Sequence, residues 1–170
     1  MKKSTLIALT ALAAVALLAP AGRAFAQSSA TASSQATATI IAPLAMTNTA
    51  PLAFGLVTTS GAAGQIELTP AGVRNSIGGA TAITGLAFNA AAFNVTGEAG
   101  RTFAITLPAS TTIAAGANTM TVNAFTSNLG ATGTLTGGVA ALNVGATLNV
   151  AANQPSGSYT GTFDVTVAYN

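Results

Sequence analysis

The sequence predicts an all-β domain, either a sandwich or a closed barrel. The clearest sign is the closing stretch GSYTGTFDVTVAYN, residues 157–170, in which large apolar residues alternate with small or polar ones. A period of two is typical of a strand with one buried face. Other short apolar runs are separated by Gly, Asn and Pro, and no helical period of any length follows residue 26. This spacing indicates many short strands joined by turns.

The expected elements follow one another at short intervals. The runs on either side of residues 97–100 predict a hairpin, because a four-residue loop bounded by glycines is a common hairpin connection. Gly137–Gly138 is a candidate two-residue turn, and residues 70–79 are expected to form a loop. The expected strands are residues 36–42, 52–57, 65–69, 91–96, 101–107, 120–125, 133–136, 139–144, 146–150 and 157–170.

The first 26 residues have the pattern of a secretory signal peptide. Lys2 and Lys3 form a positive start, an apolar run follows, and residues 24–26 are a small-x-small cleavage site. We predict cleavage between Ala26 and Gln27, after which the secreted chain has no membrane span. Cleavage removes 26 of the 170 residues and leaves 144, a flexible leader at 27–35 and one β-domain at 36–170.

Residues 27–170 carry little charge and few reactive groups. Their basic residues are Arg74 and Arg101 and their acids are Glu67, Glu98 and Asp164, so the net charge is −1. Two scattered arginines do not form the basic patch that nucleic acid requires. The absence of His, Cys and Lys excludes Ser-His-Asp and Cys-His catalysis, Schiff bases and ordinary zinc sites. We therefore expect a non-catalytic protein without metal or cofactor, stabilised by burial and strand pairing alone.

The missing lysine also bears on the sheet edges. Lysine is a usual guard on an exposed edge strand, because its charge discourages the addition of another strand. No lysine follows Lys3. The edges of this domain are therefore either covered by its own loops or used for pairing with another chain.

Two stretches resemble a known family. The residues FNVTG, at 93–97, and the closing Gly-x-Tyr-x-Gly-Thr-Phe-x-Val-x-Val-x-Tyr, at 157–169, are similar to those of the DUF4402 family of secreted bacterial proteins. The resemblance runs from about Ala36 to Asn170. More loosely, the end of the chain resembles chaperone–usher pilins and spore-coat U-type subunits, which also finish on a strand with a penultimate tyrosine, here Tyr169.

The pilin resemblance implies a protein of a Gram-negative bacterium. Its fold would be an immunoglobulin-like sandwich in which the final strand is missing. In such subunits an N-terminal extension of the next subunit fills an apolar groove beside the last strand. The implied partners are further copies, related subunits and a periplasmic chaperone, and the implied location is the cell surface, in a fimbria-like structure. The assembly strand would present Tyr159, Phe163, Val165, Val167 and Tyr169, and the donor-strand candidates in the leader are Ala30, Ala32, Ala36, Ala38 and Ile40.

Two alternatives stay open at this point. In the first, the sandwich is a closed monomer whose own first strand covers the last. In the second, it is a monomeric extracellular module that binds a carbohydrate or a protein on the loops at 70–79 and 126–134. The donor-strand candidates are mostly alanines, which bury much less apolar surface than leucine or valine. The leader would therefore be a weakly held donor.

Overall fold

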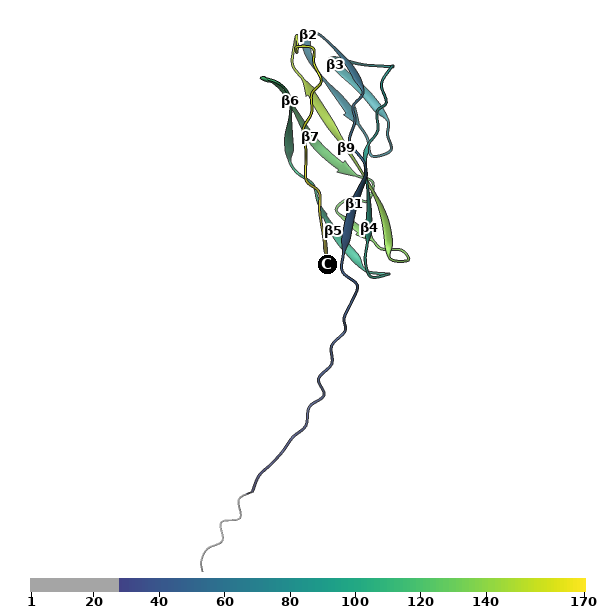
Figure 1. Cartoon of the computed structure of the whole chain (residues 1–170), viewed down its shortest axis with the longest axis vertical. Coiled ribbons are helices and arrows are strands. Elements are labelled where there is room, and N and C mark those ends of the chain that lie inside the picture. The colour runs from purple at the N-terminus through teal and green to yellow at the C-terminus, as the bar shows by residue number, and fades with distance from the viewer. Residues whose placement is uncertain (1–27) are drawn as a thin grey trace, which may run out of the picture. The chain divides into compact units, whose positions relative to one another are not determined.

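The structure, a computed structural model, describes residues 28–170. Within this range it contains ten β-strands and no helix. The strands form two antiparallel sheets that pack as an immunoglobulin-like sandwich (Figure 1). The predicted all-β sandwich class is confirmed. All strands lie within one compact unit, Thr39–Asn170.

The larger sheet has seven strands arranged around β9, and the smaller sheet has three. Residues 139–144 of β9 pair with β4, residues 146–150 pair with β2, and β7 pairs along the opposite edge. The larger sheet consists of β1 (Ala45–Ala50), β2 (Leu56–Leu68), β3 (Arg74–Ile83), β4 (Ala91–Thr96), β6 (Ser110–Ala115), β7 (Asn118–Ser127) and β9 (Val139–Val150). The smaller sheet consists of β10 (Thr166–Tyr169), β5 (Thr102–Thr106) and β8 (Thr132–Thr134), with β5 in the middle.

The core is divided into two clusters that differ in how they are covered. The first includes Phe103 and Ile105 of β5 together with Val95 and Leu142 of the larger sheet, so both sheets contribute to it. The second consists of buried residues from β2, β3, β7 and β9, all in the larger sheet. No strand of the smaller sheet contributes a buried residue to this second cluster among the described residues. Part of the larger sheet therefore lacks an opposing strand.

The expected strand at 36–42 is wrong. The described residues before β1 have no regular secondary structure, and β1 begins at Ala45. The main chain of Ala42 is bound by side chains, since its N–H donates to Glu98 and its C=O accepts from Tyr169. Pro43 then has no N–H to give to a ladder. An alternating pattern of Ala and Thr does not make a strand here without a neighbour to pair with.

The expected hairpin around residues 97–100 is also wrong. β4 pairs with β1 and β9, whereas β5 pairs with β10 and β8, so this loop joins the two sheets. Two main-chain amides of this loop bind carbonyl oxygens in and beside the Gly137–Gly138 turn. The amide of Gly97 donates to Gly138, and the amide of Gly100 donates to Leu135. A glycine-bounded loop of four residues fits either connection, and only the strand partners distinguish them.

Glycine also misled the prediction at two strands. Residues 74–79 were expected in a loop but belong to β3, where Gly78 and Gly79 let its main chain approach β2 closely. Residues 139–144 and 146–150 are one strand, β9, which runs through Gly145. A side chain at Gly145 would overlap the carbonyl oxygen of Leu68. These glycines permit close packing inside the sheet.

Two local predictions agree with the structure. Gly137 and Gly138 form a tight turn with φ values of 64° and 85°, a conformation that favours glycine. From residue 163 to residue 169, odd-numbered residues are half-buried and even-numbered ones are exposed, as the period of two predicts. The hydrogen-bonded part of the closing strand is shorter than expected, because β10 covers only Thr166–Tyr169.

Candidate functional site

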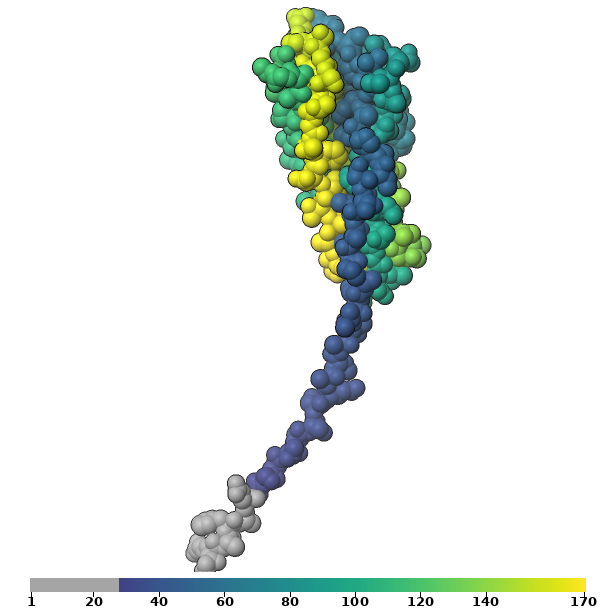
Figure 2. All heavy atoms as spheres, viewed as in Figure 1, coloured from purple at the N-terminus to yellow at the C-terminus, as the bar shows by residue number. Residues whose placement is uncertain are grey.

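The main feature of the surface is an open groove over the second core cluster. It has a volume of about 1190 Å³ and lies between residues 51–59 on one side and residues 154–163 on the other. The floor includes Val122 and Leu148 of that cluster. Figure 2 shows the C-terminal segment in yellow and the start of the domain in blue along the same face of the molecule. The groove therefore occupies the place of an opposing strand.

Both walls of the groove have main-chain groups without a main-chain partner, although only residues 56–59 of the first wall belong to a strand and the second wall precedes β10. Residues 56–59 pair with β3 on one side only, because the pairing of β2 with β9 begins at Gly64. Between residues 155 and 165, only Thr160 bonds to the main chain of another described residue, exchanging two hydrogen bonds with Ala114 at 2.9 and 3.0 Å. Side-chain hydroxyls also donate to the carbonyl oxygens of Pro155 and Thr162. Each wall can therefore accept a strand on the side that faces the groove.

The side chains along the groove are apolar and only partly covered. Leu52, Phe54 and Val57 come from the first wall, and Tyr159 and Phe163 come from the second. All five side chains are half-buried. None of the residues that line the groove is charged. The lining also includes Thr, Ser and Asn side chains, but an uncharged, mainly apolar surface between two such walls is suited to an extended apolar peptide.

Arg74 fastens the first wall to the rest of the sheet. Its guanidinium donates to the carbonyl oxygens of Phe54 at 2.7 Å, Leu56 at 3.3 Å and Ile83 at 2.8 Å. The same group lies over the ring of Phe88, 4.2 Å from the ring centroid. A planar group with several donors can hold several carbonyls at once, which lysine cannot do. Arg74 therefore holds the main chain of the first wall, at Phe54 and Leu56, against the end of β3 at Ile83.

Tyr169 links three segments of the domain through hydrogen bonds of its hydroxyl group and those of its partners. Its hydroxyl accepts a hydrogen bond from the amide of Glu98 at 2.7 Å and donates one to the carbonyl oxygen of Ala42 at 2.9 Å. The carboxylate of Glu98 in turn accepts from the amide of Ala42 at 3.0 Å. A side chain at Gly97 would overlap the Tyr169 hydroxyl, so glycine makes room for it. The last strand, the 97–100 loop and the start of the domain are thereby joined.

This contact brings together the two stretches that carry the sequence resemblance, FNVTG and the closing strand. Residues 44–169 match a family model described as a domain of unknown function, DUF4402. The chain belongs to the DUF4402 family. No curated protein and no solved structure matches the sequence. The match extends from just before β1 to the last residue of β10, so the DUF4402 domain contains both walls of the groove.

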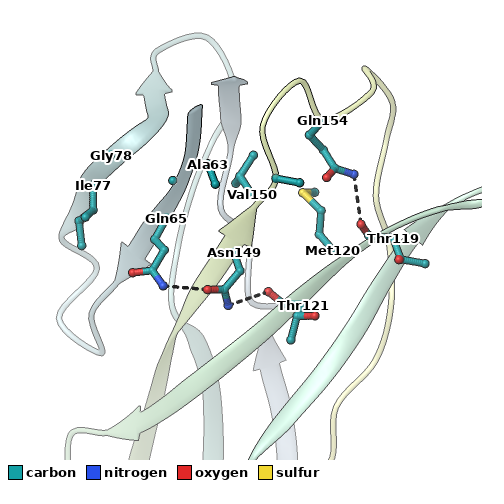
Figure 3. Close-up of a pocket in the computed structure, with 12 residues that line it drawn as sticks. Ala63, Gln65, Ile77, Gly78, Thr119, Met120, Thr121, Asn149, Val150 and Gln154 are labelled. Atoms are coloured by element: carbon teal, nitrogen blue, oxygen red, sulfur yellow. Dashed lines mark hydrogen bonds between the residues drawn. The ribbon is translucent and has the colours of Figure 1, made fainter. Parts of the chain in front are cut away.

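A second, smaller cleft of about 550 Å³ lies where β2, β7 and β9 meet (Figure 3). Gln65 donates to Asn149 at 2.8 Å, and Asn149 donates to Thr121 at 3.2 Å and to Asn123 at 2.9 Å. Gln154 donates to Thr119 at 3.1 Å. These side-chain amides form hydrogen bonds to one another and to neighbouring strands. Fewer of their donors and acceptors are therefore free to bind a ligand.

The structure places the predicted assembly residues on the second wall and its continuation. Tyr159 and Phe163 line the groove of this DUF4402 domain, whereas Val165, Val167 and Tyr169 pack against the first core cluster. Ile40, a donor-strand candidate, is 96% exposed. The other candidates, Ala30, Ala32, Ala36 and Ala38, are exposed and outside any strand. Ala26, Gln27 and the predicted signal peptide lie outside the described residues.

The first wall was missed as part of a site. The alternation of Leu52, Phe54 and Leu56 predicted a strand at 52–57, of which the structure has only Leu56 and Val57 in β2. Nothing local indicates that one edge there stays open. Over residues 28–170, no group of three His, Cys, Asp or Glu side chains is placed to hold a metal ion. The same range has no helix of the length and hydropathy needed to cross a bilayer.

Proposed function

We propose that this DUF4402 protein is a non-catalytic structural subunit, exported to the cell surface and assembled into a fimbria-like polymer by strand complementation. The observation that carries the proposal is the uncharged, mainly apolar groove of about 1190 Å³ whose two walls, residues 56–59 of β2 and the segment 155–163, have main-chain groups without main-chain partners. A strand from another polypeptide would pair with both walls and cover the second core cluster. The signal peptide predicted for residues 1–26 supplies the route of export.

The free energy available from such pairing is large enough for stable assembly. If about five large apolar side chains of the added strand enter the groove, burial at ~1.5–3 kcal/mol each gives on the order of 10 kcal/mol. A whole domain is stable by only about 5–15 kcal/mol. The partner strand would therefore contribute as much as folding itself, and a subunit without it would need protection. A periplasmic chaperone that occupies the groove during export is the partner that this reasoning favours.

The test is electrophoresis of sheared cell-surface material in detergent, with and without boiling, probed for this protein. Strand-complemented polymers are expected to give a ladder that collapses to one band on boiling. The variant Val57→Asp places a charge on the first wall and should abolish the ladder. Its control is Thr81→Asp, at an exposed residue of β3 that does not line the groove, and it should keep the ladder.

A single monomer band in both lanes would contradict assembly. It would favour the alternative function, a monomeric extracellular binding module. The smaller cleft is the observation that favours this second function, because the side-chain amides of Gln65, Asn149 and Gln154 line it. Binding of a glycan by the soluble monomer, lost on substitution of Gln65 or Asn149, would then identify the site.

A further inference from the structure

The size of the groove indicates what kind of strand fills it. Its volume of about 1190 Å³ is roughly 40 times the ~30 Å³ that one water molecule occupies in the liquid. Large side chains such as Ile113, Met120 and Phe163 line it and are only half-buried. Space left empty beside such side chains forfeits their contacts, so a filling strand has to bring bulk of its own.

The leader of a second copy does not bring that bulk. Four of its five alternating positions, Ala30, Ala32, Ala36 and Ala38, carry a single methyl group each. A leader strand would satisfy the main-chain edges of the groove and leave most of its apolar walls uncovered.

Ile40 is the one large residue in the alternating set, but its position restricts it. It lies two residues before Ala42, whose N–H and C=O are bound to Glu98 and Tyr169 of the same domain. Two extended residues span at most ~7 Å. Ile40 can therefore enter a neighbour's groove only if the two domains nearly touch there or if the bonds at Ala42 break.

The described residues after 42 offer no spare strand. Their alternating runs of large apolar residues either belong to the two sheets, such as Phe103 to Ile105 in β5 and Leu142 to Val150 in β9, or form the walls of the groove itself, as Leu52, Phe54, Tyr159 and Phe163 do. Using any of them as a donor would dismantle the core that forms the floor of the groove.

We infer that the occupant of the groove is a strand of a different polypeptide, uncharged on its inward face, with Val, Leu, Ile or Phe at alternate positions. This inference rests on the proposed function and narrows it, because the DUF4402 subunit then acts as an acceptor and does not polymerise with itself. The partner is a second kind of subunit whose own extension carries large side chains where this chain has Ala30, Ala32, Ala36 and Ala38.

The experiment uses the exported chain as acceptor and three synthetic peptides of residues 27–42. The first has the native sequence, and the second carries valine at Ala30, Ala32, Ala36 and Ala38. The third carries four valines at residues 30–33, which turns two of them away from the groove. Each alanine-to-valine change adds two buried carbon atoms, so the alternating peptide should bind about tenfold more tightly per inward valine. The grouped peptide should lie between the other two.

Amide hydrogen exchange locates the binding, since the amides of residues 161–165 and those of residues 56–59 that do not bond to β3 should slow when a strand pairs with them. In the full chain, the same four valines should cause the purified protein to polymerise, whereas the native chain alone should stay monomeric. A native leader peptide that binds as tightly as the alternating one, or a native chain that polymerises alone, would overturn the inference and leave strand complementation standing. If no peptide binds and neither chain polymerises, the inference and the proposed function both fail.

Discussion

The junction between Gly97 and Tyr169 gives the sharpest test of the packing described above. The substitution Tyr169→Phe removes the hydroxyl that binds the amide of Glu98 and the carbonyl of Ala42. At a net value of about 1 kcal/mol for each hydrogen bond, the free energy of unfolding should fall by about 2 kcal/mol. The ring itself stays packed against the first core cluster, so little burial is lost.

The substitution Gly97→Ala should break the same two bonds by another route. A Cβ atom at Gly97 would overlap the Tyr169 hydroxyl and lie 3.0 Å from the Cδ1 atom of Leu135. The hydroxyl has to move, which again costs about 2 kcal/mol. Gly97 is not among the glycines with positive φ, so alanine returns about 0.4–1 kcal/mol by restricting the unfolded chain. The net loss should be about 1–1.5 kcal/mol.

The double variant separates this mechanism from simple crowding. In the Tyr169→Phe protein the hydroxyl is absent, so Gly97→Ala should be neutral or slightly stabilising. The two effects should therefore fall short of additivity by about 2 kcal/mol. Urea denaturation followed by circular dichroism resolves this, because 2 kcal/mol moves the midpoint by about 1 M. Gly61→Ala, a change into open space, is the control and should show only the gain of about 0.4–1 kcal/mol from the restricted unfolded chain, equal in the presence and absence of the Tyr169 hydroxyl.

Additive effects within about 0.5 kcal/mol would refute the reasoning. They would mean that alanine at Gly97 acts through Leu135 and Leu44, whose Cδ1 atom is 3.2 Å from the built Cβ, and not through the hydroxyl of Tyr169.

Two further predictions concern the closing strand and the contacts of Arg74 with the first wall of the groove. Val167→Asp puts a carboxylate against the first core cluster and should cost at least about 3 kcal/mol, enough to prevent folding or assembly, whereas Ala168→Asp on the exposed face should be exported normally. Normal assembly of the Val167→Asp protein would contradict the assignment of faces. Arg74→Lys should lose about 2 kcal/mol in thermal or urea unfolding, because one ammonium cannot replace three hydrogen bonds and the stack on an aromatic ring. Arg101→Lys, at an exposed arginine, is its control, and equal losses for the two variants would show that the fork geometry is unimportant.

Sequence patterns predicted the features that depend on neighbours along the chain. The alternation toward Tyr169 and the turn at Gly137–Gly138 are local, because side-chain period and positive φ are properties of a few consecutive residues. The hairpin expected at 97–100 failed because strand partners are chosen by the whole sheet. The loop expected at 70–79 is correct for 70–73 and wrong for 74–79, because glycine permits both flexible turns and close packing of strands.

The sequence predicted one of the two walls of the groove as part of a site, and not the other. Tyr159 and Phe163 stood out through their alternation, and they do line the groove. The opposite wall, with Leu52 and Val57, carries the same kind of signal as any covered strand. The groove exists because no strand among the described residues pairs with residues 56–59 on the side that faces it. The local sequence of a strand does not indicate whether its second edge will be paired. The role of Arg74 was hidden for a related reason, since its partners are carbonyl oxygens that every residue possesses.

The fastening of Ala42 to Tyr169 and Glu98 also determines how the domain carries tension. A pull on the chain before Ala42 reaches the domain at this point, immediately before β1. β1 is registered against β4 from Ala45 opposite Thr96 to Ala50 opposite Ala92, with ladder bonds perpendicular to the strands. A force along β1 therefore loads these bonds in shear, and they must break together, not one after another. The lifetime of the domain under load is then set by the barrier to that concerted rupture, a kinetic property that its equilibrium stability does not measure.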